Sequence, residues 1–243
     1  MPSALDHLMA FLITIAFPGY DLIRTHPRFR QAVARGEPAA RLRFYRSAVV
    51  GYWLVAAAVV GAWWWEGRSW EALGLGTGSG WRAWVGAALA VATAIFLVAQ
   101  ARAANAPAVR SSLLGQIEPM RAYLPHTDAE LRWFYGVSVS AGICEELLFR
   151  GFLLWYLAAW LPLGAAVPLA AAYFGVQHHF LGRGGAVRAG IMALVFSALY
   201  LGLDSLWAVM AIHAFVDISS GWLAHRLLAG EPAPIATSVR LGT

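Results

Sequence analysis

The sequence predicts an all-α fold, a polytopic membrane bundle of about seven transmembrane helices, with eight as the alternative. Of the 243 residues, 60% are hydrophobic and only 13% are charged. A soluble domain of this length would need more charge to cover its surface, whereas several spans of about 20 apolar residues use up most of the chain. We therefore expect an integral membrane protein in contact with the lipid bilayer, without a separate soluble module.

Seven apolar runs define the expected spans. Pro18-Gly19 would end or kink the first run, and Trp63-Trp64-Trp65 closes the second as an interfacial anchor would. The fourth run is longer than a bilayer requires, so it either tilts or begins as an amphipathic helix. The runs cover residues 7–23, 47–65, 82–101, 131–161, 163–181, 186–203 and 204–228.

The chain divides into three parts on this reading. Residues 1–130 hold the N-terminal spans and basic loops, 131–228 form a core with the ionisable residues, and 229–243 form an irregular C-terminal tail. The loop between the third and fourth spans contains three prolines, and we expect a short surface helix there, over the site.

Arginine accounts for the net charge of +5, because the chain has no lysine. Arginines gather in the first, third and fifth loops and in the tail, whereas the fourth and sixth loops have none. The positive-inside rule then places the N-terminus outside and the C-terminus in the cytoplasm. Because the arginines lie in loops between apolar runs, we expect no nucleic-acid partner.

Ionisable residues inside the spans are few and lie late in the chain. An ionised side chain at bilayer depth costs several kcal/mol, so such residues are kept mainly where they have partners and a task. The fourth, fifth and seventh spans carry them: Glu145, Glu146, Arg150, His178, His179, His213 and Asp217.

Helical spacing suggests roles for these residues. Glu146 and Arg150 are four residues apart and can form an ion pair, which leaves Glu145 about 100° round the helix without a local cation. A histidine of the fifth span would give Glu145 a partner and form a general base that activates water. His213 and Asp217, also four apart, could hold a donor toward the oxyanion of a hydrolytic intermediate.

Three motifs on the fourth, fifth and seventh spans resemble, in their order along the chain, those of the CPBP intramembrane proteases. This family is also called Abi and includes the type II CAAX prenyl endopeptidases. The resemblance covers about residues 131–228 and implies a CAAX-protease-like core and metal-independent glutamic catalysis, with no cofactor. The motifs are Glu145-Glu146-x-x-x-Arg150, Phe174-x-x-x-His178 and His213-x-x-x-Asp217.

The resemblance also implies site roles. Glu145 and His178 would activate the water, and His213 with Asp217 would stabilise the tetrahedral intermediate. The supporting residues would be Glu146, Arg150 and Phe174. Prenyl endopeptidases carry Asn where Asp217 stands, and an ionised Asp would repel an oxyanion. Asp217 is therefore expected either to be protonated or to orient His213.

Two other functions remain open. Glu145, His178 and His213 would also make a His₂Glu zinc triad, although the sequence has no His-Glu-x-x-His motif. The same buried residues could instead form the relay of a proton-coupled transporter or a non-catalytic scaffold.

We expect an intramembrane endopeptidase whose partner is a peptide or protein with a membrane-associated segment, cleaved near the membrane face. The arginine-only, alanine-rich composition favours a GC-rich bacterial genome and location in the cytoplasmic membrane. It therefore favours processing of an envelope or secreted protein over a prenylated one.

Overall fold

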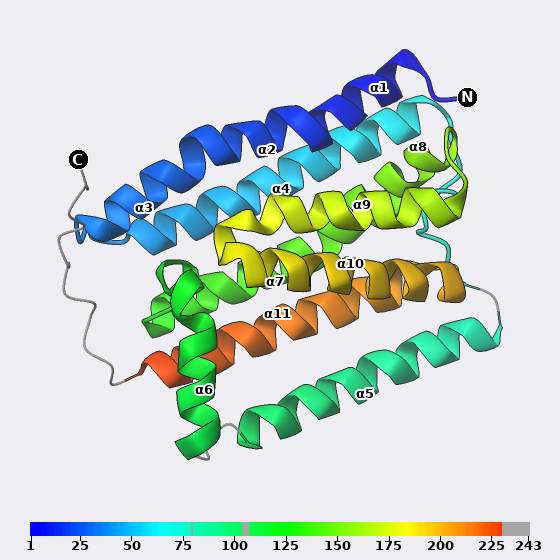
Figure 1. Ribbon diagram of the computed structural model, residues 1–243. Coiled ribbons are helices and arrows are strands. Elements are labelled where there is room, and N and C mark those ends of the chain that lie inside the picture. Colours follow the sequence, from blue (N-terminus) through cyan, green and yellow to red (C-terminus); the bar gives the residue numbers. More distant parts are fainter. Residues whose placement is uncertain (79, 104–106, 230–243) are drawn as a thin grey trace.

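The computed structural model describes residues 1–78, 80–103 and 107–229. In these residues seven long helical stretches pack side by side, and one short helix, α6, lies across one end of them (Figure 1). The arrangement confirms the predicted all-α membrane bundle. The three-part division of the chain stays a prediction, and its tail from residue 230 onward lies outside the described residues.

The first stretch is one continuous helical rod that runs beside α4 (Figure 1). It does not end at Pro18-Gly19. Pro18 lacks the N–H that would bond to the preceding turn of the rod. Carbonyl oxygens of that turn accept from another helix instead: Tyr173 O–H donates to Thr14 and Gln177 Nε2 donates to Ile13. π-Helical turns lie on both sides of the short α-segment that holds Pro18. The rod consists of α1 (Ala4–Phe11), η1 (Leu12–Ala16), α2 (Phe17–Tyr20), η2 (Asp21–Thr25) and α3 (His26–Ala34).

The other helices match the remaining six apolar runs to within a few residues at most ends. The third loop forms the expected short helix, α6, followed by a 3₁₀ turn, η3. The elements are α4 (Ala40–Trp65), α5 (Trp81–Ala103), α6 (Pro107–Ile117), η3 (Glu118–Tyr123), α7 (Asp128–Glu146), η4 (Leu147–Leu153), α8 (Leu154–Ala158), α9 (Leu163–Gln177), η5 (His178–Leu181), α10 (Gly182–Leu203) and α11 (Trp207–Leu228).

Five segments of the described chain are long and apolar enough to cross a membrane. One of them folds back on itself at Gly182, whose φ of 80° turns α9 into the antiparallel α10 (Figure 1). The stretch from α7 to α8 is not among the five, and it carries the paired acids and Arg150. The five segments are Ala4–Ala34, Ala40–Trp65, Trp81–Arg102, Leu163–Leu203 and Trp207–Leu228.

Helix α7 is held on two sides, by α4 and by α11. It begins at a capping box, in which Thr127 and Glu130 satisfy each other's backbone N–H groups. Trp53 Nε1 of α4 donates a hydrogen bond to Ser140 Oγ at 3.0 Å. On the other side, a Cβ built on Gly142 would lie 2.7 Å from the backbone nitrogen of Ala214. Only glycine therefore allows α7 and α11 to approach this closely.

Candidate active site

The two acids end α7 inside the bundle. Glu145 is 6% exposed and Glu146 is fully buried, and the π-helical η4 follows directly. Arg150, in η4, donates to Glu146 Oε1 at 3.0 Å, which is the ion pair predicted from the spacing. A buried pair of this kind is costly to break, because the remaining charge would be left in a low-dielectric interior.

Arg150 is fixed by more than this ion pair. Its second terminal nitrogen donates to the carbonyl oxygen of Ala193 at 3.3 Å. The guanidinium also lies over two aromatic rings, 4.9 Å from the centroid of Phe174 and 5.7 Å from that of Phe196. Phe174, a predicted supporting residue, thus packs against the cation that neutralises Glu146.

His213 lies among three carboxylates. Its Nδ1–H donates to Glu146 Oε1 at 2.7 Å. Its Nε2 lies 3.6 Å from Asp217 Oδ2 and 3.8 Å from Glu145 Oε2, both beyond hydrogen-bond range. The contact that orients His213 therefore comes from Glu146, which sequence spacing alone linked only to Arg150.

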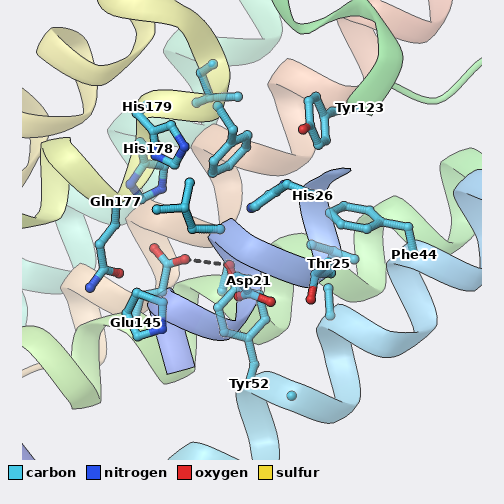
Figure 2. Close-up of a pocket in the computed structure, with 18 of the residues that line it drawn as sticks. Asp21, Thr25, His26, Phe44, Tyr52, Tyr123, Glu145, Gln177, His178 and His179 are labelled. Carbon is cyan, nitrogen blue, oxygen red and sulfur yellow. Dashed lines mark hydrogen bonds between the residues drawn. The ribbon is translucent and has the colours of Figure 1, made fainter. Parts of the chain in front are cut away.

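Tyr52 of α4 is a contact that the sequence analysis missed. Its hydroxyl donates to Glu145 Oε1 at 2.6 Å (Figure 2). Tyr52 is 93 residues before Glu145 in the chain, so no local spacing links the two. A tyrosine in the middle of an apolar span is a weak signal, because its hydroxyl needs a partner when buried.

His178 begins η5, at the end of α9. Its Nδ1 is 2.8 Å from the carbonyl oxygen of Phe174, and because a carbonyl only accepts, the hydrogen lies on Nδ1. In the neutral ring Nε2 is then free to accept a proton. The ring also packs against the Phe174 ring, with centroids 4.4 Å apart.

The predicted partnership of Glu145 with a fifth-span histidine is not a direct contact. Within the described residues no hydrogen bond or ion pair joins Glu145 to His178, and the carboxylate meets Tyr52 and His213 instead. Both Glu145 and His178 nevertheless line one cavity (Figure 2). His179, the neighbour of His178, lines this cavity as well.

This cavity has a volume of about 1360 Å³ and extends from the acids toward the turn between α3 and α4. Its polar lining near Glu145 includes Asp21, Gln177, His213 and Asp217, none of which bonds to the Glu145 carboxylate at hydrogen-bond distance. Part of η3 also lines it, so the third loop does contribute to the site. In the described part of the chain, no group of three His, Cys, Asp or Glu side chains is arranged to hold a metal ion.

The structure thus brings together most of the residues predicted for the site. Glu145, Glu146, Arg150, His213 and Asp217 form one connected cluster. His178 lies apart from this cluster, across the cavity lining, and Phe174 bridges to both through its carbonyl oxygen and its ring.

Comparison with known proteins finds a family match over part of the chain. Residues 127–219 match the family model described as type II CAAX prenyl endopeptidase Rce1-like. The matched segment holds all three motifs and confirms the resemblance seen in the sequence. No curated protein and no solved structure matches the chain.

Proposed function

We propose that this membrane protein hydrolyses a peptide bond with water activated by Glu145 and His178, starting from the match of residues 127–219 to the type II CAAX prenyl endopeptidase Rce1-like family model. The observation that carries the proposal is the Glu145 carboxylate, buried among fixed partners yet lining a cavity large enough for a peptide segment. Helices that enclose such a polar cavity keep their own backbones satisfied inside a bilayer.

The proposed reaction begins with a water held between Glu145 and His178, which fits the absence of a direct contact between them. The water oxygen attacks the carbonyl carbon while its proton passes to the Glu145 carboxylate. The C–N bond then breaks, and the departing amine takes up this proton from Glu145, which restores the carboxylate. Tyr52 holds Oε1 of Glu145, so Oε2 is the oxygen that serves as the base.

His213 is proposed to stabilise the oxyanion. In its doubly protonated form the ring donates from Nε2, while Nδ1 stays bonded to Glu146. Three carboxylates within 3.8 Å compensate its positive charge. Asp217 then need not orient the ring, and we propose that it tunes the charge of this cluster.

We also propose that the cavity opens toward the cytoplasm. The turn between α3 and α4, the η3 turn and the C-terminal end of α11 lie at one end of the bundle (Figure 1). The cavity extends to this end, and the basic loops gather there. Under the positive-inside rule this arrangement supports an outside N-terminus and a substrate presented at the cytoplasmic face.

The test is a quantitative proteomic comparison of membranes and medium from cells that express wild-type protein, Glu145→Gln or Glu71→Gln at matched levels. Glu71 is an exposed acid outside the cavity lining, so its variant controls for loss of a carboxylate. We expect one or more precursors to accumulate only with Glu145→Gln. If no precursor responds to Glu145→Gln while the cellular phenotype of the wild type persists, the catalytic assignment is wrong and a transport or scaffold role gains ground.

A further inference from the structure

The outer part of the cavity is rimmed by arginines. We call Arg24, Arg28, Arg35, Arg43 and Arg188 the mouth arginines, because all five line the cavity. Four belong to the α3–α4 side and one to α10. Glu37 at this rim pairs with two of them, with Arg35 at 3.7 Å and with Arg43 at 2.9 Å.

Three of the mouth arginines lack a partner among the residues that the structure describes. Within the described residues Arg24, Arg28 and Arg188 form no hydrogen bond or ion pair, and each side chain is exposed. Arg46 at this end instead stacks on Trp133, with its guanidinium 4.9 Å from the ring centroid. Arg30 and Arg183 are exposed as well, but they do not line the cavity. Arg24, Arg28 and Arg188 are the exposed cations that an entering chain would meet.

The spacing of Arg24 and Arg28 suits an extended chain. Four helical residues rise about 6 Å. Alternate side chains of an extended strand point the same way and are about 6.7 Å apart. Two acids separated by one residue in an extended peptide could therefore face Arg24 and Arg28 together.

The same cavity has an aromatic wall, which would face side chains that the arginines do not contact. His26 stacks on Phe180 with centroids 4.4 Å apart, and Tyr123 packs on Phe180 at 5.1 Å. His26, Tyr123 and Phe44 lie together at the edge of the cavity, with His178 and His179 nearby (Figure 2).

We propose that the mouth arginines bind the substrate itself, as an extended segment with acidic side chains at positions i and i+2. Apolar residues at the alternate positions contact the aromatic wall, and the acidic part lies on the cytoplasmic side of the scissile bond. This inference rests on the proposed function, whose substrate class it specifies.

The experiment measures peptide binding by fluorescence anisotropy, with the full chain in phosphatidylcholine nanodiscs and Glu145→Gln as the background so that nothing is cleaved. The probes are short fluorescein-labelled Ala-Leu peptides with aspartates at i and i+2, with aspartates at i and i+1, or with asparagines at i and i+2. Because binding is read without hydrolysis, its outcome is independent of the proteomic test of catalysis.

The matched variants compare arginines that line the cavity with arginines on the outer surface. Arg28→Gln with Arg188→Gln removes two mouth arginines, whereas Arg30→Gln with Arg183→Gln removes two exposed arginines on the same elements that do not line the cavity. We expect the first pair to weaken binding of the i, i+2 peptide about tenfold and the second to change it less than about threefold. The effect should shrink as salt is raised.

Three results would overturn the proposal. The asparagine peptide could bind as well as the acidic one, the i, i+1 peptide could bind as well as the i, i+2 peptide, or both variant pairs could weaken binding equally. If the mouth variants instead change peptide binding only in nanodiscs that contain phosphatidylglycerol, the proposal is also overturned and these arginines are lipid contacts.

Discussion

Gly142 sets the distance between α7 and α11 at the site, and Gly142→Ala is the sharpest test of this packing. The added Cβ would lie 2.7 Å from the nitrogen and 2.9 Å from the Cβ of Ala214, and 2.9 Å from the carbonyl oxygen of Met210. Two of these three atoms are backbone, so no side chain can rotate away. Carbon atoms normally pack at about 3.5–4.0 Å, so the helices must separate by roughly 1 Å.

That separation directly affects the cluster around His213, to which we assign the catalytic role. Ala214 follows His213, whose Nδ1 is 2.7 Å from Glu146 Oε1. A shift of about 1 Å would take this hydrogen bond beyond its usual limit of about 3.2 Å. Overpacking of this kind destabilises the fold by about 1–3 kcal/mol, while replacing a helical glycine with alanine stabilises the helix by about 0.5–1 kcal/mol.

Gly136→Ala on the same helix is the matched control. The nearest atom to its added Cβ is Val49 Cγ2 at 4.0 Å, an ordinary contact, so only the favourable helix propensity remains. Gly142→Ala should therefore be less stable than Gly136→Ala by about 1–3 kcal/mol in unfolding free energy. Each kcal/mol corresponds to a decrease of about 2–4 °C in Tm. The assay is thermal unfolding in mild detergent, followed by circular dichroism.

Gly142→Ala should also lose cleavage of any precursor that the proteomic comparison identifies, whereas Gly136→Ala should keep it. Equal melting temperatures for the two variants would refute the close approach of α7 and α11. If Gly142→Ala is destabilised but fully active, the close packing of α7 and α11 is not needed for activity. That result would refute the argument that this packing supports catalysis through the His213–Glu146 hydrogen bond.

Four further predictions concern three single contacts and the requirement for a metal ion. Tyr52→Phe should lower kcat for the identified precursor about 10- to 100-fold with little change in KM, because a hydrogen bond to a charged group is lost; Tyr45→Phe, which removes another buried hydroxyl of α4, should leave kcat unchanged. Arg150→Met should destabilise the protein by about 3–5 kcal/mol in detergent melts, and adding Glu146→Gln should recover part of this loss. Asp217→Asn should keep activity within about tenfold of wild type, since Glu146 orients His213; a larger loss would assign Asp217 a direct role. Incubation with 1,10-phenanthroline should leave cleavage unchanged, and an inhibition reversed by added zinc would support the zinc triad.

Much of the fold follows from local sequence patterns. Hydropathy located seven long helical stretches, and the i, i+4 spacing correctly paired Glu146 with Arg150. Pro18 was a weaker guide, because flanking π-helical turns let the first rod continue through it. Carbonyl oxygens of the turn before Pro18 also accept hydrogen bonds from Tyr173 and Gln177 of α9, contacts that a local proline rule does not include.

The sequence identified most of the residues that the structure brings together, but it did not identify which of them contact each other. The hydrogen bonds of Glu146 to His213 and of Tyr52 to Glu145 join residues 67 and 93 positions apart. Helical periodicity relates residues only within a few turns, so it could not distinguish which acid faces which histidine. The predicted link between Glu145 and a fifth-span histidine therefore became a shared cavity rather than a bond.

The sequence by itself determined the helical membrane class, the order of the spans and the set of ionisable residues placed inside them. These depend on composition and on periodicities that act within single helices. Only the tertiary structure decided that His213 binds Glu146, that Tyr52 donates a hydrogen bond to Glu145 and that exposed arginines line the cavity mouth. Such contacts depend on the distance and rotation between helices, and small residues such as Gly142, whose neighbours lie in another helix, set that distance.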